Sequence, residues 1–479
     1  MTTQQPLQVL FMGTGTSTAL PITPCLTLTA PYPKSWNDMV PIFQGCPPSS
    51  SAPTAALSSP SQPLIYESTY DPDGIWPKNI PCTCCRSCVD TDVPEGWKNK
   101  RGNTSIVVRK QNQEGKWKNI VVDVGKTFRE QAMRLFPRWN VQTIDAVLLT
   151  HGHADAYLGL DDLREWCIRQ GRAIPVYLNR ETFVKVEEAF PYMVDKSKAS
   201  GGGDIPQLVW NIIDDEGEFQ VEGINVKAFP VHHGIYFHSV LPLNGRPAHN
   251  SCVQNEPLPL ICLAFEFDES VIYMSDVSSI PEQTWERMLE SASRRQTTLS
   301  TPDRPVRESV LPSQPILDIA NPSASTSHSL RPSEMKASTP NYPLLIVDAL
   351  WPTKGHPSHF SFAQALATSL RLKAANTYLT GMTHPTSHFM WEEICQSLLD
   401  PDGRHHKARN HPDARQAEWL VKRIWDGIFT EGRNGQGLGD RWRTDGGVVK
   451  PAWDGLVLEV NQKGEAVERL DKSTKGLFI

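Results

Sequence analysis

The sequence has little that would suit binding to nucleic acid or insertion into a membrane. Its 479 residues carry 47 Lys and Arg against 53 Asp and Glu, which gives a net charge of −6. No basic field is therefore expected, and no nucleic-acid partner. No apolar run has the length of a membrane span, and the polar start of the chain lacks the apolar core of a signal peptide. These absences predict a cytoplasmic protein without a membrane partner, with a nuclear location left open.

The cysteines are not distributed as in a disulfide-bonded framework. Four of the 10 lie close together, at Cys82, Cys84, Cys85 and Cys88. Thiolates at this spacing can share one tetrahedral zinc ion with a ligand from elsewhere in the chain. The alternative is a loop in which cysteines are close by chance. The crowding favours a structural zinc site and leaves open which thiolates bind.

The strongest signal in the chain follows a predicted strand. The apolar, β-branched run over 144–150 predicts a buried strand, and His151, His153 and Asp155 come directly after it. Imidazole and carboxylate groups at the end of a buried strand are the donors that a divalent cation needs. A polar surface turn with two histidines is the alternative reading. The aspartate and the strand before it favour the metal site.

Two more predicted strands end in residues of the same kind. The strand over 224–229 leads to the adjacent His232 and His233, and the strand over 270–275 is followed by Asp276. Each could be an ordinary turn residue if it stood alone. Together they predict that side chains at the tips of successive strands converge on a common cation.

The run from His151 to Asp155 resembles the His-x-His-x-Asp-His signature of the metallo-β-lactamase-fold hydrolases. The glycine turn after the first predicted strand (7–12), the cysteine cluster and the ending Asp454-Gly455 look closest to the phosphoribosyl 1,2-cyclic phosphate phosphodiesterases of that group. The resemblance extends over 7–460. It implies an α/β fold, the αββα metallo-β-lactamase sandwich, with long loop insertions.

The same resemblance implies a ligand set. His151, His153 and His233 would hold one ion, Asp276 would bridge to a second ion, and Asp155 would belong to that second ion. The implied ions are Zn²⁺ or Mn²⁺ in the active site and a structural Zn²⁺ at the cysteine cluster.

The sequence departs from the signature where the second ion would bind. Ala156 replaces its final histidine. An alignment without a gap puts Gly381 in the place of a later histidine and joins His384 to the cysteine-bound zinc. Both losses then affect one site, and we hypothesise that this site is weakened, remodelled or empty. A rival alignment puts His384 in the active site and His388 with the cysteines; we favour the first.

Composition and pattern predict one domain over 1–479 with three long insertions. The segment 31–74 is rich in Pro and Ser, and 294–342 is rich in Ser, Pro and Thr and is predicted to be disordered. The segment 400–446 is polar, with one predicted helix over 414–428. Strands and helices elsewhere alternate as in a layered α/β sandwich.

The resemblance implies hydrolysis of a small or cyclic phosphodiester by a metal-bound hydroxide. Asp155 would orient or deprotonate the water, and His359 would protonate the leaving oxygen. For His359 the alternative is a helix-capping surface histidine. Alternative functions are hydrolysis of esters, thioesters or lactones, or metal binding without catalysis. The partner expected is a small phosphodiester, and a homodimer is among the oligomeric states left open.

Overall fold

The protein is described here by a computed structural model. The structure describes residues 5–27, 83–89, 93–199, 201, 204–237, 257–300, 340–384, 386–399, 411, 413–428, 437–461 and 465–469. The predicted insertion 31–74 and the predicted ligand Cys82 lie outside these residues.

Two β-sheets form the centre of the molecule. The first has the strand order β15-β14-β1-β2-β3-β4-β5-β6, and the second has the order β13-β12-β11-β10-β9-β8-β7. The strands of the first sheet are β1 (Leu7–Gly13), β2 (Ser105–Gln111), β3 (Trp117–Val122), β4 (Ala146–Leu148), β5 (Ile174–Leu178), β6 (Leu208–Ile212), β14 (Val457–Val460) and β15 (Ala466–Glu468). Those of the second are β7 (Glu218–Val221), β8 (Ile224–Phe237), β9 (Pro257–Phe267), β10 (Val271–Met274), β11 (Tyr342–Asp348), β12 (Ala374–Thr380) and β13 (Val448–Pro451).

The two sheets pack face to face because each presents alternate apolar side chains to the other. Val9 and Phe11 of β1 contribute from the first sheet, and Phe265 and Tyr273 from the second, in one continuous buried cluster. Period-two alternation in a strand places such residues on a single face. Burial of this face is what holds the sheets together.

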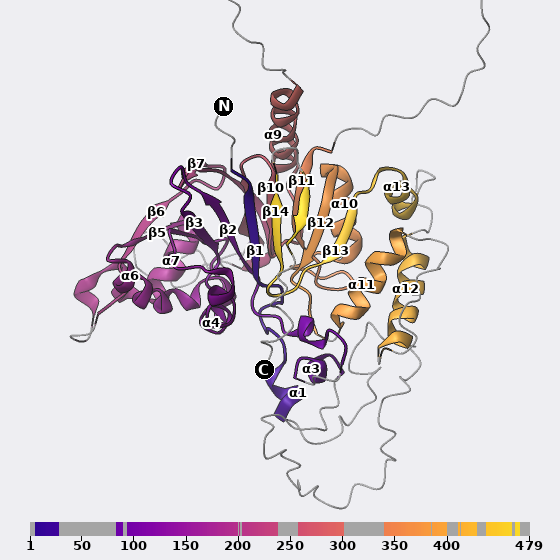
Figure 1. Ribbon diagram of the computed structural model, residues 1–479, viewed down its shortest axis with the longest axis horizontal. Helices are drawn as coiled ribbons and strands as arrows, with labels where there is room; N and C mark the ends of the chain where they lie inside the picture. The colour runs from indigo at the N-terminus through magenta and orange to yellow at the C-terminus, as the bar shows by residue number, and fades with distance from the viewer. Residues whose placement is uncertain are drawn as a thin grey trace, which may run out of the picture.

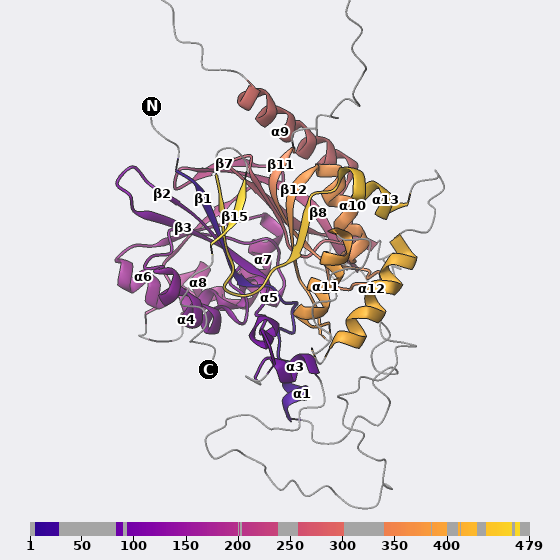
Figure 2. The same ribbon diagram turned by 45° about the vertical axis from the view of Figure 1, so that its right-hand side comes forward.

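Helices cover the outer face of each sheet, which completes four layers. Figure 1 shows α4, α6 and α7 beside the first sheet and α10 to α13 beside the second, and Figure 2 keeps this arrangement after a 45° turn. Separate apolar clusters fill the two outer layers. The helices of the first side are α4 (Phe128–Trp139), α5 (Ala154–Tyr157), α6 (Arg164–Gln170), α7 (Arg180–Ala189) and α8 (Pro191–Val194). Those of the second are α9 (Glu282–Ser300), α10 (Phe362–Leu372), α11 (His388–Leu399), α12 (Ala414–Ile428) and α13 (Leu438–Asp445).

Short helical turns complete the described chain. These are α1 (Thr23–Thr27), α3 (Thr83–Ser87) and the 3₁₀ helices Gly96–Asn99, Leu158–Leu163 and Lys196–Lys198. The architecture is the predicted α/β sandwich of two sheets between helical layers. No helix among the described residues is long and apolar enough to span a membrane.

Two of the predicted insertions need correction. Helix α9 runs on to Ser300, so the segment predicted to be disordered from residue 294 begins inside a helix. The segment 400–446 contains α13 as well as the predicted α12, and Leu420 and Trp442 from these helices are buried in the core of the second side. Polar residues dominate the sequence here because both helices are amphipathic, with a narrow apolar face.

Candidate metal centre

Two of the strands predicted to carry ligands end just before them, whereas the predicted strand over 224–229 runs on to Phe237 and contains its ligand. β4 ends at Leu148, just before His151, and β10 ends at Met274, just before Asp276. His233 lies within β8, where an irregularity in the pairing with β9 interrupts the register after His232. A bulge of this kind redirects a side chain without ending the strand.

Four donor groups converge at this edge: His151, His153, His233 and Asp276. One ligand atom from each lies within 4.8 Å of the others. The nearest pair is His233 Nε2 and His153 Nδ1, 3.2 Å apart, and Asp276 Oδ2 lies 3.5 Å from His233 Nε2. Three imidazoles and one carboxylate around a common centre form a donor set for a divalent transition metal. His232 does not join them, because its Nδ1 lies 3.2 Å from the Ser279 hydroxyl.

Hydrogen-bond partners of His233 and His151 determine which ring nitrogen of each faces the centre. His233 Nδ1 donates to the Ser358 carbonyl at 2.6 Å, which leaves Nε2 for a metal. His151 Nδ1 lies 2.8 Å from Thr150 Oγ1, and that hydroxyl donates to Asp123 Oδ2 at 2.8 Å. Partners of this kind set the tautomer and orientation of metal-binding histidines. Asp123 is thus linked to His151 through the Thr150 hydroxyl.

The family comparison agrees with this geometry. Residues 118–293, which contain all four donors, match the beta-lactamase superfamily domain. The chain has the metallo-β-lactamase fold. The resemblance predicted from the sequence is therefore confirmed.

Individual proteins similar to this metallo-β-lactamase-fold protein differ in how much of it they cover. An octanoyltransferase of Porphyromonas gingivalis (strain ATCC BAA-308 / W83) is 32% identical over 150 residues, which are 31% of this chain and 27% of that protein. The chain thus spans about a quarter of the curated relative that it matches. Among solved structures, a diphosphatase of the PhnP family is 18% identical with a TM-score of 0.45, covering 95% of this chain and 97% of that one. YhfI from Bacillus subtilis is 12% identical with a TM-score of 0.39, covering 75% and 92%.

Burial and neighbouring groups set the charge of three donor groups in this metallo-β-lactamase-fold protein: His151, His153 and Asp276. Burial lowers the pKa of His151 well below its usual value, and burial together with His233 lowers the pKa of His153. Both rings are therefore neutral near pH 7, which is the form that binds a metal. Burial would raise the pKa of Asp276, but His233 and His359 more than offset it, and the pKa of this carboxyl lies below its usual range. Asp276 is thus a carboxylate, ready to act as a ligand.

Asp155 adjoins the four donors without belonging to their group. It shares a small cavity of about 10 Å³ with His151 and Asp276, and also with Thr104, Asp123, Ala156 and Ser275. Burial and the nearby Asp276 raise the pKa of Asp155 to about 6. The structure therefore places this predicted ligand beside the metal centre, and its carboxylate remains basic enough to accept a proton near neutral pH.

His359 faces the same centre from the loop after β11. Its ring lies 4.8 Å from that of His233, centroid to centroid, and its Nδ1 donates to Asp348 Oδ2 at 2.8 Å. Burial alone would lower the pKa of His359, but the Asp348 carboxylate raises it to about 9. The alternative role as a helix cap falls to Ser361, which forms the capping box of α10 with Gln364. No pattern in the sequence indicates this pairing of Asp348 with His359.

The cysteine cluster assembles differently from the prediction. One thiol of the predicted set, Cys85, meets His384 and also Cys25, all three ligand atoms lying within 4.8 Å of one another. Cys84 Sγ faces Asn99 Oδ1 at 3.8 Å, and Cys88 Sγ donates to the Cys84 carbonyl at 3.3 Å. Two thiols and an imidazole suit zinc. Cys84 and Cys88 are therefore not part of this group.

Cys25 was missed because it lies far from the other cysteines in the sequence. Its one signal is its place after the glycine turn that follows β1, where the resemblance already put backbone near the site. His384 joins this group rather than the active site, in agreement with the favoured alignment, and His388 pairs with Glu392 at 3.1 Å. The fully buried Arg101 donates to the Met382 carbonyl at 3.3 Å and so stabilises the loop that carries His384.

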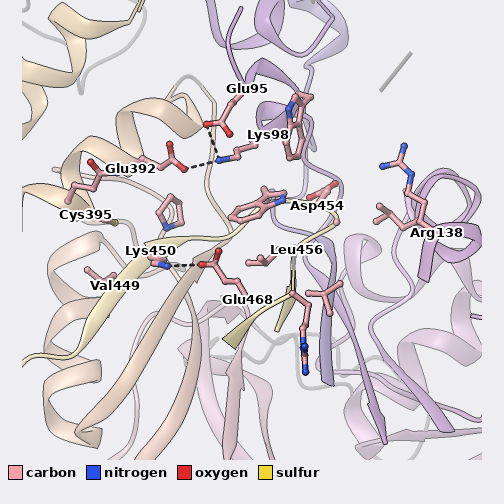
Figure 3. Close-up of a pocket in the computed structure, with 18 of the residues that line it drawn as sticks. Glu95, Lys98, Arg138, Glu392, Cys395, Val449, Lys450, Asp454, Leu456 and Glu468 are labelled. Atoms are coloured by element: carbon pink, nitrogen blue, oxygen red, sulfur yellow. Dashed lines mark hydrogen bonds and ion pairs between the residues drawn. The ribbon is translucent and has the colours of Figure 1, made fainter. Parts of the chain in front are cut away.

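A larger cavity lies away from both groups. It has a volume of about 440 Å³ between α4, α11, β13 and β15. Figure 3 shows ion pairs among the residues that line it: Lys98 with Glu392 at 3.0 Å, and Lys450 with Glu468 at 2.7 Å. None of the predicted site residues lines this cavity. The candidate metal ligands and His359 lie at the edge of the two sheets instead.

Proposed function

We propose that this chain is a metal-dependent phosphodiesterase that hydrolyses a small phosphodiester. One observation carries the proposal: His151, His153, His233 and Asp276 converge on one point, and His359 reaches the same point from another strand end. Metal ligands and a proton donor in one place are the minimum that such a reaction requires.

The residues present fit a divalent ion. His151 Nε2 is buried and has no hydrogen-bond partner, although buried polar atoms are almost always satisfied. A cation among the four donor atoms would satisfy it. An ion of Zn²⁺ or Mn²⁺ type in this position supplies Lewis acidity, which draws charge from phosphoryl oxygens and makes water more acidic.

Two side chains of the protein would accept and donate the protons of the reaction. The Asp155 carboxylate adjoins the donor group and is placed to orient water and accept its proton. His359 Nδ1 is held by Asp348, so Nε2 is the ring atom that remains to give a proton to the leaving oxygen. A carboxylate on one side and a histidine on the other support acid–base catalysis.

Charge near the centre favours an anionic substrate. The Lys126 side chain, whose Nζ donates to the Ser17 carbonyl at 2.6 Å, partly offsets the rise that burial and Asp276 cause in the pKa of Asp155. His359 contributes a second basic group near the centre. The net charge of −6 argues against a long nucleic acid. A small phosphodiester meets both conditions, and the resemblance noted in the sequence supports a cyclic one.

The test is hydrolysis of bis-p-nitrophenyl phosphate by the metal-loaded protein, compared with a panel of lactones, esters and thioesters. We expect turnover of the diester and little of the others. His153→Ala should lose more than about 100-fold in kcat/KM, because it removes one of four ligands. His232→Ala is the matched control, since its ring contacts Ser279 instead, and it should keep the activity. Preferential turnover of a lactone, or an active His153→Ala protein, would contradict the proposal.

A further inference from the structure

The donors at the strand ends are unevenly distributed around the centre. Among the described residues of the active site, one group brings three or more metal-binding side chains together, and it consists of His151, His153, His233 and Asp276. Asp155 is the one predicted ligand at this edge that stands outside it. What surrounds Asp155 therefore decides whether a second ion has a site of its own.

The space beside Asp155 is small and offers few free donors. The cavity that it shares with Asp276 has a volume of about 10 Å³, near the least that a single water molecule requires. Asp123 also lines it, but both of its carboxylate oxygens already accept hydrogen bonds from Thr150. Residue 156 contributes only the methyl group of an alanine, 2% exposed. Two aspartates remain, fewer than the three or four protein ligands of a tight site.

The residue directly after the neighbouring strand β12 does not supply the missing donor. The residue that follows it is Gly381, with φ +67°, and a Cβ atom there would lie 2.2 Å from Asp348 Oδ1. Asp348 cannot turn away easily, because its Oδ2 accepts from His359 Nδ1 at 2.8 Å and from the backbone N–H groups of Val277 and Phe360 at 3.3 Å each. The Asp348 carboxylate thus takes the space in which a side chain at residue 381 would begin.

From these observations we infer that the active site binds a single divalent ion, and that Asp155 is not one of its ligands. The inference rests on the proposed function in taking the histidine cluster as the metal centre. It goes further in that Asp155 contacts the substrate or water instead of a metal ion. Asp348 and Ala156 occupy the space that a second ion and its ligands would need.

The test compares the metal content of three proteins after loading with Zn²⁺ and removal of free metal. His153→Ala should contain one equivalent less than the unmodified protein. Asp155→Ala should contain the same amount as the unmodified protein, because the ion does not depend on it. Loss of an equivalent from Asp155→Ala would overturn the inference and leave the proposed function intact. An unchanged content in His153→Ala would instead remove the metal centre on which both depend.

A second measurement needs no variant. The protein loaded with excess Mn²⁺ should give the electron paramagnetic resonance spectrum of isolated ions, since the other ion group lies apart at Cys25, Cys85 and His384. An exchange-coupled spectrum would show two manganese ions sharing a ligand, and it would overturn the inference even if Asp155→Ala failed to fold.

Discussion

Replacement of Gly381 by alanine tests the packing beside the metal centre most directly. The new Cβ would lie 2.2 Å from Asp348 Oδ1, a distance at which one of the two groups must move. Asp348 is fully buried and holds His359. We therefore expect Gly381→Ala to unfold more easily and to misplace the His359 ring.

The size of the loss follows from two contributions. Alanine in a left-handed conformation costs about 1 kcal/mol relative to glycine. Displacement of Asp348 weakens a charge-assisted hydrogen bond to His359, which contributes about 1.5–3 kcal/mol, and two backbone hydrogen bonds of about 1 kcal/mol each. Because some of these bonds will re-form after relaxation, the expected total is about 3–5 kcal/mol.

Gly171 provides a matched control. It has φ +63°, close to the φ +67° of Gly381, but a Cβ there would meet nothing within 4 Å. Gly171→Ala should therefore lose only the conformational part, about 1 kcal/mol. Urea unfolding followed by tryptophan fluorescence gives both free energies, provided that the slope of each transition is unchanged. Losses that agree within about 0.5 kcal/mol would show that Asp348 does not occupy the space above Gly381.

Three further predictions concern residues around the two ion groups. Burial lowers the pKa of His388 to about 4 from 6.5, so its contribution to stability is complete above pH 6.5 and is lost as the pH falls toward 4. Urea unfolding should therefore show about 2 kcal/mol less stability at pH 5 than at pH 7 from this residue. A His388→Gln protein with the same pH profile as the unmodified protein would disprove this prediction. Thr150→Val removes the hydroxyl between His151 and Asp123 and should weaken metal binding about 10- to 100-fold in a chelator competition, whereas equal affinity would exclude a role in orienting the ligand. Cys85→Ala should lose one equivalent of zinc and Cys84→Ala none, and the opposite result would reverse the assignment of the thiols.

Local patterns in the sequence were enough to predict the strands and the ligands at their ends. The apolar run before His151 and the aspartate after β10 both follow from periodicity and residue type. Side chains just after the ends of neighbouring strands lie close together, so the convergence of His151 and Asp276 was predictable. The predicted strand before His233 was too short, because β8 continues to Phe237 and an irregularity in its pairing with β9 places this ligand. The structure places all three within reach of one ion.

Contacts between segments that are distant in the sequence were not predictable in this way. No local pattern indicates that Asp348 would accept a hydrogen bond from His359 and orient its ring, because this contact depends on the path of the loop after β11. Cys25 and Cys85 are separated by a long stretch of chain, and their encounter depends on how two sheets bring α1 and α3 together. The helical end of α9 was missed because residues 294–300 contain one large apolar residue, Leu299, and so lack the apolar periodicity that indicates a helix.

The meeting of Cys25 with Cys85 has a consequence for the stretch between them. Ile22 N–H donates to Cys85 Sγ at 3.4 Å, so two residues that are far apart in the sequence lie side by side. The entropy of closing such a loop grows only with the logarithm of its length. A change in the number of residues between Ile22 and Cys85 should therefore alter the entropy of bringing these two residues together only slightly.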